Sequence, residues 1–183
     1  MPRSDTEGGA AVLVAYASEH GSTREIAERV ARRLTRSGHR AEARPVDGAV
    51  DPDPGRYDAV VVGSAVHNQQ WLPAAAGYVR RHRTELSKRP VWLFSVGMAE
   101  ALGRALRNRA MRHEPKDMPA LRGEIHPVET RQFSGAVRRG DLPPAGHAVF
   151  MAMGGRYGDY RHWEQIDAWT DGIAQRLRKA EPA

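Results

Sequence analysis

Apolar residues along this chain follow two alternating patterns, one continuous and one periodic. Nearly continuous apolar runs occupy three segments, 12–17, 57–63 and 90–96. Such runs are typical of strands buried on both faces of a parallel sheet. Between them, Ile26, Val30 and Leu34 recur at helical spacing and predict an amphipathic helix that stops at Gly38. Strands that alternate with such helices predict a doubly wound α/β sandwich.

The remaining segments complete a sheet of five parallel strands flanked by helices. The further expected elements are strands at 41–46 and near 126–133, helices at 73–86, 99–112 and 159–177, and loops at 47–55 and 64–72. Ligands of such sheets bind beyond the carboxyl ends of the strands, where the winding reverses. With the strand order 2-1-3-4-5, the loops at 17–23, 63–72 and 97–102 would meet at that edge.

The composition is that of a globular protein with an excess of positive charge. The chain has 183 residues, 40% of them hydrophobic, a net charge of +6 and a pI near 10.1. One domain is expected over 11–178, between flexible tails at 1–10 and 179–183. No apolar run approaches the ~18 residues of a membrane span. The absence of cysteine excludes disulfides and thiolate metal sites and fits a cytoplasmic protein.

Most of the positive charge is arginine, and it is spread along helices in a way that predicts solvated faces. The first helix illustrates this with Arg24, Arg29, Arg32, Arg33 and Arg36. No compact basic run with interleaved aromatic residues is present, so nucleic acid is not expected as a partner. The same charge suits an acidic redox partner protein or the anionic headgroups of a membrane surface.

The segment that joins the first strand to the first helix carries the candidate site. Its residues are Ser18, Glu19, His20, Gly21, Ser22 and Thr23. Unpaired N–H groups at a helix start, hydroxyl groups and a glycine that permits close approach form a cradle for a phosphate. Ser22 and Glu25 also predict a capping box. For this loop alone the alternative is an ordinary capped turn, and for His20 an exposed surface position. No spacing of His, Asp and Glu predicts a metal site.

Several short motifs resemble those of flavodoxins. The Ser-x-x-Gly-Ser-Thr sequence at 18–23 is similar to the loop that binds the FMN phosphate in that family. Further similar motifs follow in order at 63–66, 71–73, 94–96, 133–137, 154–155 and 159–163. The ordered set resembles the flavodoxin-domain branch that contains menaquinone-dependent protoporphyrinogen oxidase. The resemblance implies a flavodoxin-like fold with strand order 2-1-3-4-5, bound FMN, and electron or hydride transfer through the flavin.

The resemblance also implies where the isoalloxazine ring lies, between the loops after the third and fourth strands. The expected contacts are Ala65, Val66, His67, Asn68, Gln69 and Trp71 in the first loop, and Gly97, Met98 and Ala99 in the second. Trp71 either stacks on the ring or belongs to the core beside the next helix. No side chain is identified as catalytic, because the flavin itself supplies the chemistry.

The predicted function is that of an FMN-binding oxidoreductase or electron-transfer protein. In line with the resemblance, its small-molecule partners would be a porphyrinogen-type substrate and a quinone acceptor. Two alternatives stay open, a carrier that exchanges electrons with a larger protein and a phosphate-binding module without flavin. Three roles stay open for the apolar segment 148–153: part of the core, a contact with the substrate, or a contact with a membrane.

Overall fold

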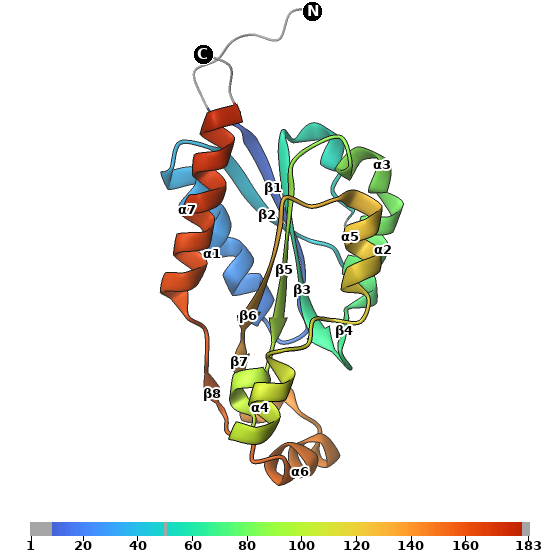
Figure 1. The fold of residues 1–183 in the computed structure, drawn as a ribbon, viewed down its shortest axis with the longest axis vertical. Coiled ribbons are helices and arrows are strands. Elements are labelled where there is room, and N and C mark those ends of the chain that lie inside the picture. The colour runs from blue at the N-terminus through green and yellow to red at the C-terminus, as the bar shows by residue number, and fades with distance from the viewer. Residues whose placement is uncertain (1–8, 50, 181–183) are drawn as a thin grey trace, which may run out of the picture.

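A parallel β-sheet lies between two layers of helices, with a smaller helical lobe beyond the carboxyl ends of its strands (Figure 1). The computed structural model describes residues 9–49 and 51–180, so most of both expected tails lies outside the described residues. The strands are β1 (Ala11–Ala17), β2 (Arg40–Pro45), β3 (Ala59–His67), β4 (Gln70–Trp71), β5 (Val91–Gly97), β6 (Glu129–Ser134), β7 (Ala136–Val137) and β8 (Gly158–Asp159). The α-helices are α1 (Ser22–Arg36), α2 (Pro73–Arg81), α3 (Arg83–Leu86), α4 (Arg104–Ala110), α5 (Met118–Ile125), α6 (Pro144–Ala152) and α7 (Trp163–Ala180).

The main sheet has the strand order β2-β1-β3-β5-β6, and all of these neighbours are parallel. Because β4 only folds back on β3, this order is the predicted 2-1-3-4-5 with shifted numbers, and the predicted fold class is confirmed. In the register of the sheet, Ala17 lies opposite Ser64, and Ala65 lies opposite Val96. The strands β1, β3 and β5 therefore end side by side.

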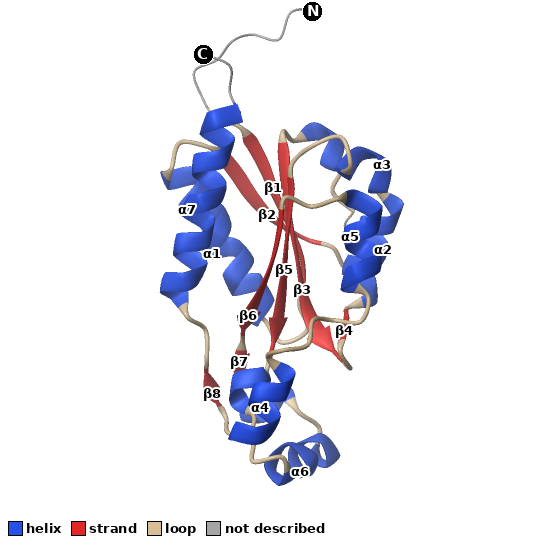
Figure 2. Cartoon of the chain, viewed as in Figure 1, coloured by secondary structure: helices blue, strands red, loops and turns tan. Residues whose placement is uncertain are grey.

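Both faces of the sheet are covered, which explains the continuous apolar runs. In β1, Val12 and Val14 point to the layer of α1 and α7, and Leu13 and Ala15 point to the layer of α2, α3 and α5. All four side chains are fully buried. Figure 2 shows the two helical layers on either side of the strands. A strand with apolar residues at every position thus contributes side chains to the cores on both faces of the sheet.

Residues 64–72 form a hairpin, and their prediction as a loop is wrong. The strand β4 pairs antiparallel with the end of β3, with Val66 opposite Trp71. The turn residues Asn68 and Gln69 have φ angles of 50° and 63°, the left-handed geometry whose twist suits a two-residue hairpin turn. Because glutamine rarely occupies this region, the sequence lacks the Asn-Gly signal by which such turns are predicted.

Helix α5 lies between the helix expected at 99–112 and the strand expected near 126–133, in a segment for which no helix is predicted. Met118, Leu121 and Ile125 are buried at helical spacing in the core. Pro119 and Gly123 make the sequence pattern unlike that of a helix, although proline is tolerated in a first helical turn. Three apolar positions at helical spacing are too few to predict a helix in a segment that also contains proline and glycine.

The helices predicted at 73–86, 99–112 and 159–177 have other bounds in the structure, and α6 is a helix that was not predicted. The helix expected at 73–86 is divided at His82 into α2 and α3, and α4 begins only after Gly103. The last helix, α7, begins at Trp163, because Gly158–Asp159 pair with β7 as a small second sheet. Contacts between distant segments therefore set these boundaries.

Helices α1 and α7 are joined by a ladder of ion pairs. Arg29 donates two hydrogen bonds to Asp167, at 2.7 and 2.8 Å, and Arg33 donates two to Asp171, both at 2.6 Å. Arg33 also lies 3.1 Å from Asp167. The prediction that these arginines are freely solvated is therefore wrong for Arg29 and Arg33. Their spacing shows which face of α1 they share, but it does not reveal the acidic face of α7 opposite.

The ladder is expected to make stability depend on pH. Hydrogen bonds from Arg29 and Arg33 hold the pKa of Asp167 and of Asp171, respectively, below its ordinary value. Such a lowered pKa contributes stability above the unfolded-state value near 4, and this contribution is lost as pH falls through the folded-state value. We expect Asp167→Asn/Asp171→Asn to lower the free energy of unfolding by about 1–2 kcal/mol at pH 7.

The measurement is urea unfolding of both proteins between pH 7 and pH 3. The stability gap between them should shrink as pH falls below about 4, because the carboxylates of the unfolded wild type then bind protons before those of the folded protein do. Glu164→Gln on the same helix is the control, since Glu164 makes no ion pair with the residues that the structure describes. A gap that stays constant over this pH range would contradict the role of the ladder.

Candidate functional site

The loops of the candidate site meet at the carboxyl edge of the sheet. His67 Nδ1 lies 3.1 Å from Glu19 Oε2, which ties the β3–β4 hairpin to the loop after β1. The N–H of Gly135 donates to the carbonyl of Gly97 at 2.8 Å, which ties the end of β6 to the loop after β5. The strand order thus brings together the three loops that the sequence places at this edge.

The loop after β1 is an open cradle at the start of α1. Gly21 has a φ of 92°, a left-handed conformation that glycine adopts without strain. Ser18 Oγ accepts the Gly21 N–H at 3.0 Å, and the Gly21 carbonyl accepts the first helical hydrogen bond, from Glu25, at 3.0 Å. Among the described residues, none offers an acceptor to the N–H groups of 22–24. The positive end of the helix dipole therefore carries three free donors.

The Thr23 hydroxyl at this helix start lacks a partner. Thr23 is only 1% exposed, and within residues 9–49 and 51–180 its Oγ1 has no hydrogen-bond partner. A buried hydroxyl without a partner is costly and therefore uncommon. A phosphate oxygen at the helix start would supply the missing acceptor, together with partners for the neighbouring N–H groups. The residues present thus fit the phosphate end of FMN.

The predicted capping box of Ser22 and Glu25 is wrong. Gly21 is the N-cap and makes no side-chain cap, and Ser22 is already the first helical residue. Ser22 Oγ accepts the N–H of Ala136 at 2.9 Å and donates to the carbonyl of Ala136 at 3.3 Å. Glu25 instead pairs with Arg161. Partners from β7 and from the segment before α7 outcompete the local cap, and they leave the donors of the helix start free.

Arg161 joins the helix start to the segment before α7. It donates to Glu25 and, through Nε at 2.8 Å, to Asp159, and its side chain is only 7% exposed. Its guanidinium also lies 4.6 Å from the ring centroid of Trp163. Hydrogen bonds from Arg161 lower the pKa of Glu25 and of Asp159 below their usual values. Both carboxylates therefore stay ionised beside the Arg161 cation, and Glu25 lies in the first turn of α1, next to the cradle.

The predicted ring contacts range from exposed to buried, with Ala65, Val66, Gly97 and Ala99 half-buried. Asn68 and Gln69 are exposed at the hairpin tip, and Met98 is 38% exposed after β5. Trp71 is only 3% exposed, and its indole N–H donates to Ser95 Oγ at 2.8 Å. The ring of Trp71 lies among core residues, as the core alternative predicts, and has no free face for stacking.

A second polar cluster at this edge was not predicted. His162 Nε2 lies 2.8 Å from Glu100 Oε2, and Ser134 Oγ donates to Glu100 Oε1 at 2.9 Å. These residues come from three segments far apart in the sequence, so no local spacing could reveal them. Among the described residues, no group of three or more His, Asp or Glu side chains could hold a metal ion.

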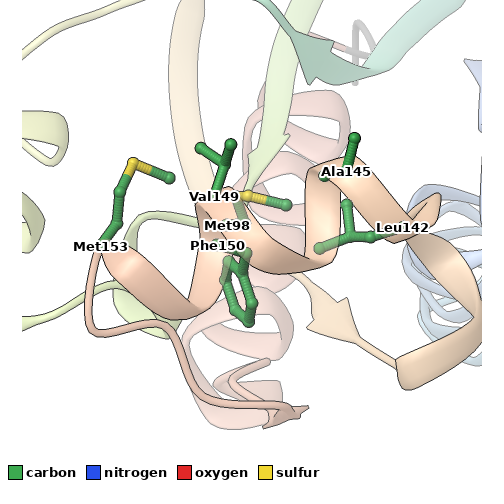
Figure 3. A pocket seen from close by; sticks show the side chains of 7 residues that line it. Met98, Leu142, Ala145, Val149, Phe150 and Met153 are labelled. Carbon is green, nitrogen blue, oxygen red and sulfur yellow. The ribbon is translucent and has the colours of Figure 1, made fainter.

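An apolar pocket of about 340 Å³ opens beside the loop after β5 (Figure 3). Met98 from that loop lies across from side chains of α6 and its flanking residues. These are Leu142, Ala145, Val149, Phe150 and Met153. The segment 148–153 is therefore not core, apart from Phe150, which is 2% exposed. No helix among the described residues is long and apolar enough to cross a bilayer.

Comparison with known proteins gives two kinds of match. Residues 13–145 match the family described as the flavodoxin domain. Protoporphyrinogen IX dehydrogenase (quinone) of Escherichia coli strain K12 is 30% identical over 86 residues, which is 47% of this chain and 48% of that protein. The match to this curated relative thus spans only about half of its length.

Solved structures support the fold at low sequence identity. A flavodoxin from the domain Archaea superposes with a TM-score of 0.61 at 12% identity, over 92% of this chain and 99% of that one. The Flv1 flavodiiron core from Synechocystis superposes with a TM-score of 0.62 at 15% identity, over 95% of this chain and 37% of that one. At such identities the likeness concerns the fold alone.

Proposed function

This chain belongs to the flavodoxin domain family, and from that premise we propose that it binds FMN and acts as a redox protein. The observation that carries the proposal is the buried, unpartnered Thr23 hydroxyl beside three free N–H groups at the start of α1. The Ser18 hydroxyl accepts from Gly21 and keeps its own proton to donate. Neutral donors at a helix start can hold a phosphate dianion without a lysine.

The protein's part in the reaction is to hold and orient the cofactor. FMN supplies electron or hydride transfer when bound. The β3–β4 hairpin and residues 97–99 would flank the flavin ring and offer it backbone donors and acceptors, while Trp71 supports the hairpin from the core. Met98 would border the ring on the side of the apolar pocket, where it can keep water from the flavin edge.

The binding proposal predicts a phosphate-specific defect in Thr23→Val. Loss of a hydrogen bond to a charged group costs about 1.5–3 kcal/mol, so the Kd for FMN should rise about tenfold or more. Riboflavin, which lacks the phosphate, should bind equally to both proteins. Titration of each flavin followed by its fluorescence measures both values.

Thr35→Val is the matched control for this experiment. Thr35 lies in the last turn of α1, where its hydroxyl donates to the carbonyl of Ala31 at 3.0 Å, so FMN affinity should not change. Wild-type protein that rejects FMN at every concentration would refute the proposal. Equal losses of FMN and riboflavin affinity in Thr23→Val would refute the phosphate role of this hydroxyl.

For the substrates, we propose dehydrogenation of a porphyrinogen-type compound with a quinone as acceptor. Support comes from the related half of Protoporphyrinogen IX dehydrogenase (quinone) and from the apolar pocket beside residues 97–99. Steady-state turnover of protoporphyrinogen IX with a water-soluble quinone tests this. FMN-loaded protein that shows no turnover alone, yet accepts electrons from a reductase, would instead be a carrier.

A further inference from the structure

Helix α6 is an apolar helix that the fold leaves uncovered. Its nine residues include no charged side chain, and among them only Phe150 is buried. Val149 is 58% exposed and Met151 is 49% exposed. Two large apolar side chains this open, beside a pocket with an apolar lining, form a patch of the kind that marks an interaction surface.

Unpaired arginines surround this helix. The segments 101–113 and 142–158, which form α4, α6 and their flanks, contain no Asp or Glu. Their arginines are Arg104, Arg107, Arg109, Arg112 and Arg156, and none of them has an ion-pair partner among the residues that the structure describes. On α1, by contrast, Arg29 and Arg33 are paired with α7. Five arginines without an ion-pair partner among the described residues therefore lie on the segments that form and flank α4 and α6.

The two segments are held together as one surface. The N–H of Gly103, just before α4, donates to the carbonyl of Met153, just after α6, at 3.1 Å. The N–H of Arg156 donates to the carbonyl of Ala101 at 2.8 Å. Buried Ala101, Val137 and Phe150 form a small core beneath them. Figure 1 shows α4 and α6 together at the end of the molecule beyond the strands.

We propose that this α4–α6 surface docks on an anionic lipid bilayer. An uncharged apolar helix flanked by arginines suits the boundary between headgroups and acyl chains, where apolar side chains enter the bilayer and cations meet lipid phosphates. A second copy of the chain is the poorer occupant, since the same surplus of arginines would face itself. Charge complementarity therefore favours an anionic membrane as the partner of the α4–α6 surface.

Docking in this orientation has a consequence that rests on the proposed function. Met98 lies both in the loop that would flank the flavin and in the lining of the pocket at α6. A bilayer bound to α6 would bring lipid-soluble redox partners to that loop, whereas docking itself needs no flavin. Failure of FMN binding and failure of membrane binding are thus separate results.

Co-sedimentation with vesicles tests the surface. The probes are phosphatidylcholine vesicles with and without phosphatidylglycerol, and the 183-residue chain is measured with and without added FMN. We expect binding only to the anionic vesicles. Arg107→Gln/Arg109→Gln should weaken it about 30-fold, at about 1 kcal/mol for each arginine near the surface. Val149→Glu/Met151→Glu should abolish it, because two carboxylates cannot enter the interface of an anionic bilayer.

Arg36→Gln/Arg40→Gln is the matched control. It removes the same charge from the end of α1 and the start of β2, at the opposite end of the strands, and should leave binding unchanged. Circular dichroism checks that each variant is folded. An equal loss in the control, unchanged binding of Val149→Glu/Met151→Glu, or no binding by the wild type would overturn the proposal. So would a dimer in solution that Val149→Glu/Met151→Glu dissociates.

Discussion

Gly63→Ala is expected to destabilise the protein by about 3 kcal/mol, because the added methyl group would overlap a buried ring. A Cβ atom at Gly63 would lie 2.0 Å from Cζ of Phe94, the residue opposite it on β5. The Phe94 ring is fully buried and packs edge-on against Trp169, with their centroids 5.9 Å apart. It cannot move away without opening the core between the sheet and α7. Urea unfolding measures the loss.

A double-mutant cycle shows whether the ring is the cause. Phe94→Leu removes the ring atoms that approach Gly63, so Gly63→Ala should cost much less in that background than in the wild type. Gly172→Ala is the control, since a Cβ at this position of α7 has no other atom within 4 Å. It should be neutral or stabilise by up to about 1 kcal/mol. Additive costs of Gly63→Ala and Phe94→Leu would contradict the steric explanation.

Arg161→Gln is expected to weaken both the fold and phosphate binding. It strands Glu25 and Asp159 without their shared cation, but both carboxylates are partly exposed, so solvent screening limits the expected loss to about 2 kcal/mol. Glu25 would then keep only its longer ion pair with Arg138, at 3.4 Å, and its less compensated charge would also repel a phosphate dianion at the start of α1. We expect the Kd for FMN to rise about tenfold, or about 1.4 kcal/mol, with riboflavin affinity unchanged.

Removal of the Glu25 charge as well should restore the FMN affinity that Arg161→Gln loses. Glu25→Gln/Arg161→Gln is expected to regain most of the FMN affinity, since neither charge then remains, even where stability stays reduced. Arg122→Gln removes an arginine that pairs with Glu114 on the surface and controls for net charge. If the double variant binds FMN no better than Arg161→Gln, the effect is structural rather than electrostatic.

The layered fold could be predicted because its signals are local. The apolar runs of β1, β3 and β5 and the stripe of Ile26, Val30 and Leu34 on α1 are each complete within one segment. The cradle at 18–23 is likewise a property of one strand–helix junction. Strand order followed from the general rules of doubly wound sheets together with the family resemblance.

The features that could not be predicted depend on contacts between distant segments. Ser22 forms its hydrogen bonds with Ala136, 114 positions later, so the local capping signal was misleading. The hairpin turn at Asn68 and Gln69 lacks glycine. Its geometry is supported by Lys116, whose backbone N–H donates to the Gln69 carbonyl at 2.8 Å. Sequence patterns report which residues share a face. They do not report which partner from elsewhere competes for a hydroxyl or a charge.

The distant partners of α1 also bear on when the protein matures during synthesis. Ser22 pairs with Ala136, and Glu25 pairs with Arg161, and both partners are synthesised more than 100 residues later. The nascent chain therefore exposes its first strand–helix junction long before these partners leave the ribosome. Until then the junction has no rigid frame and its carboxylate is uncompensated. Loading of the proposed FMN would therefore require synthesis of the chain through Arg161, and a truncated product that ends before Arg161 should remain colourless.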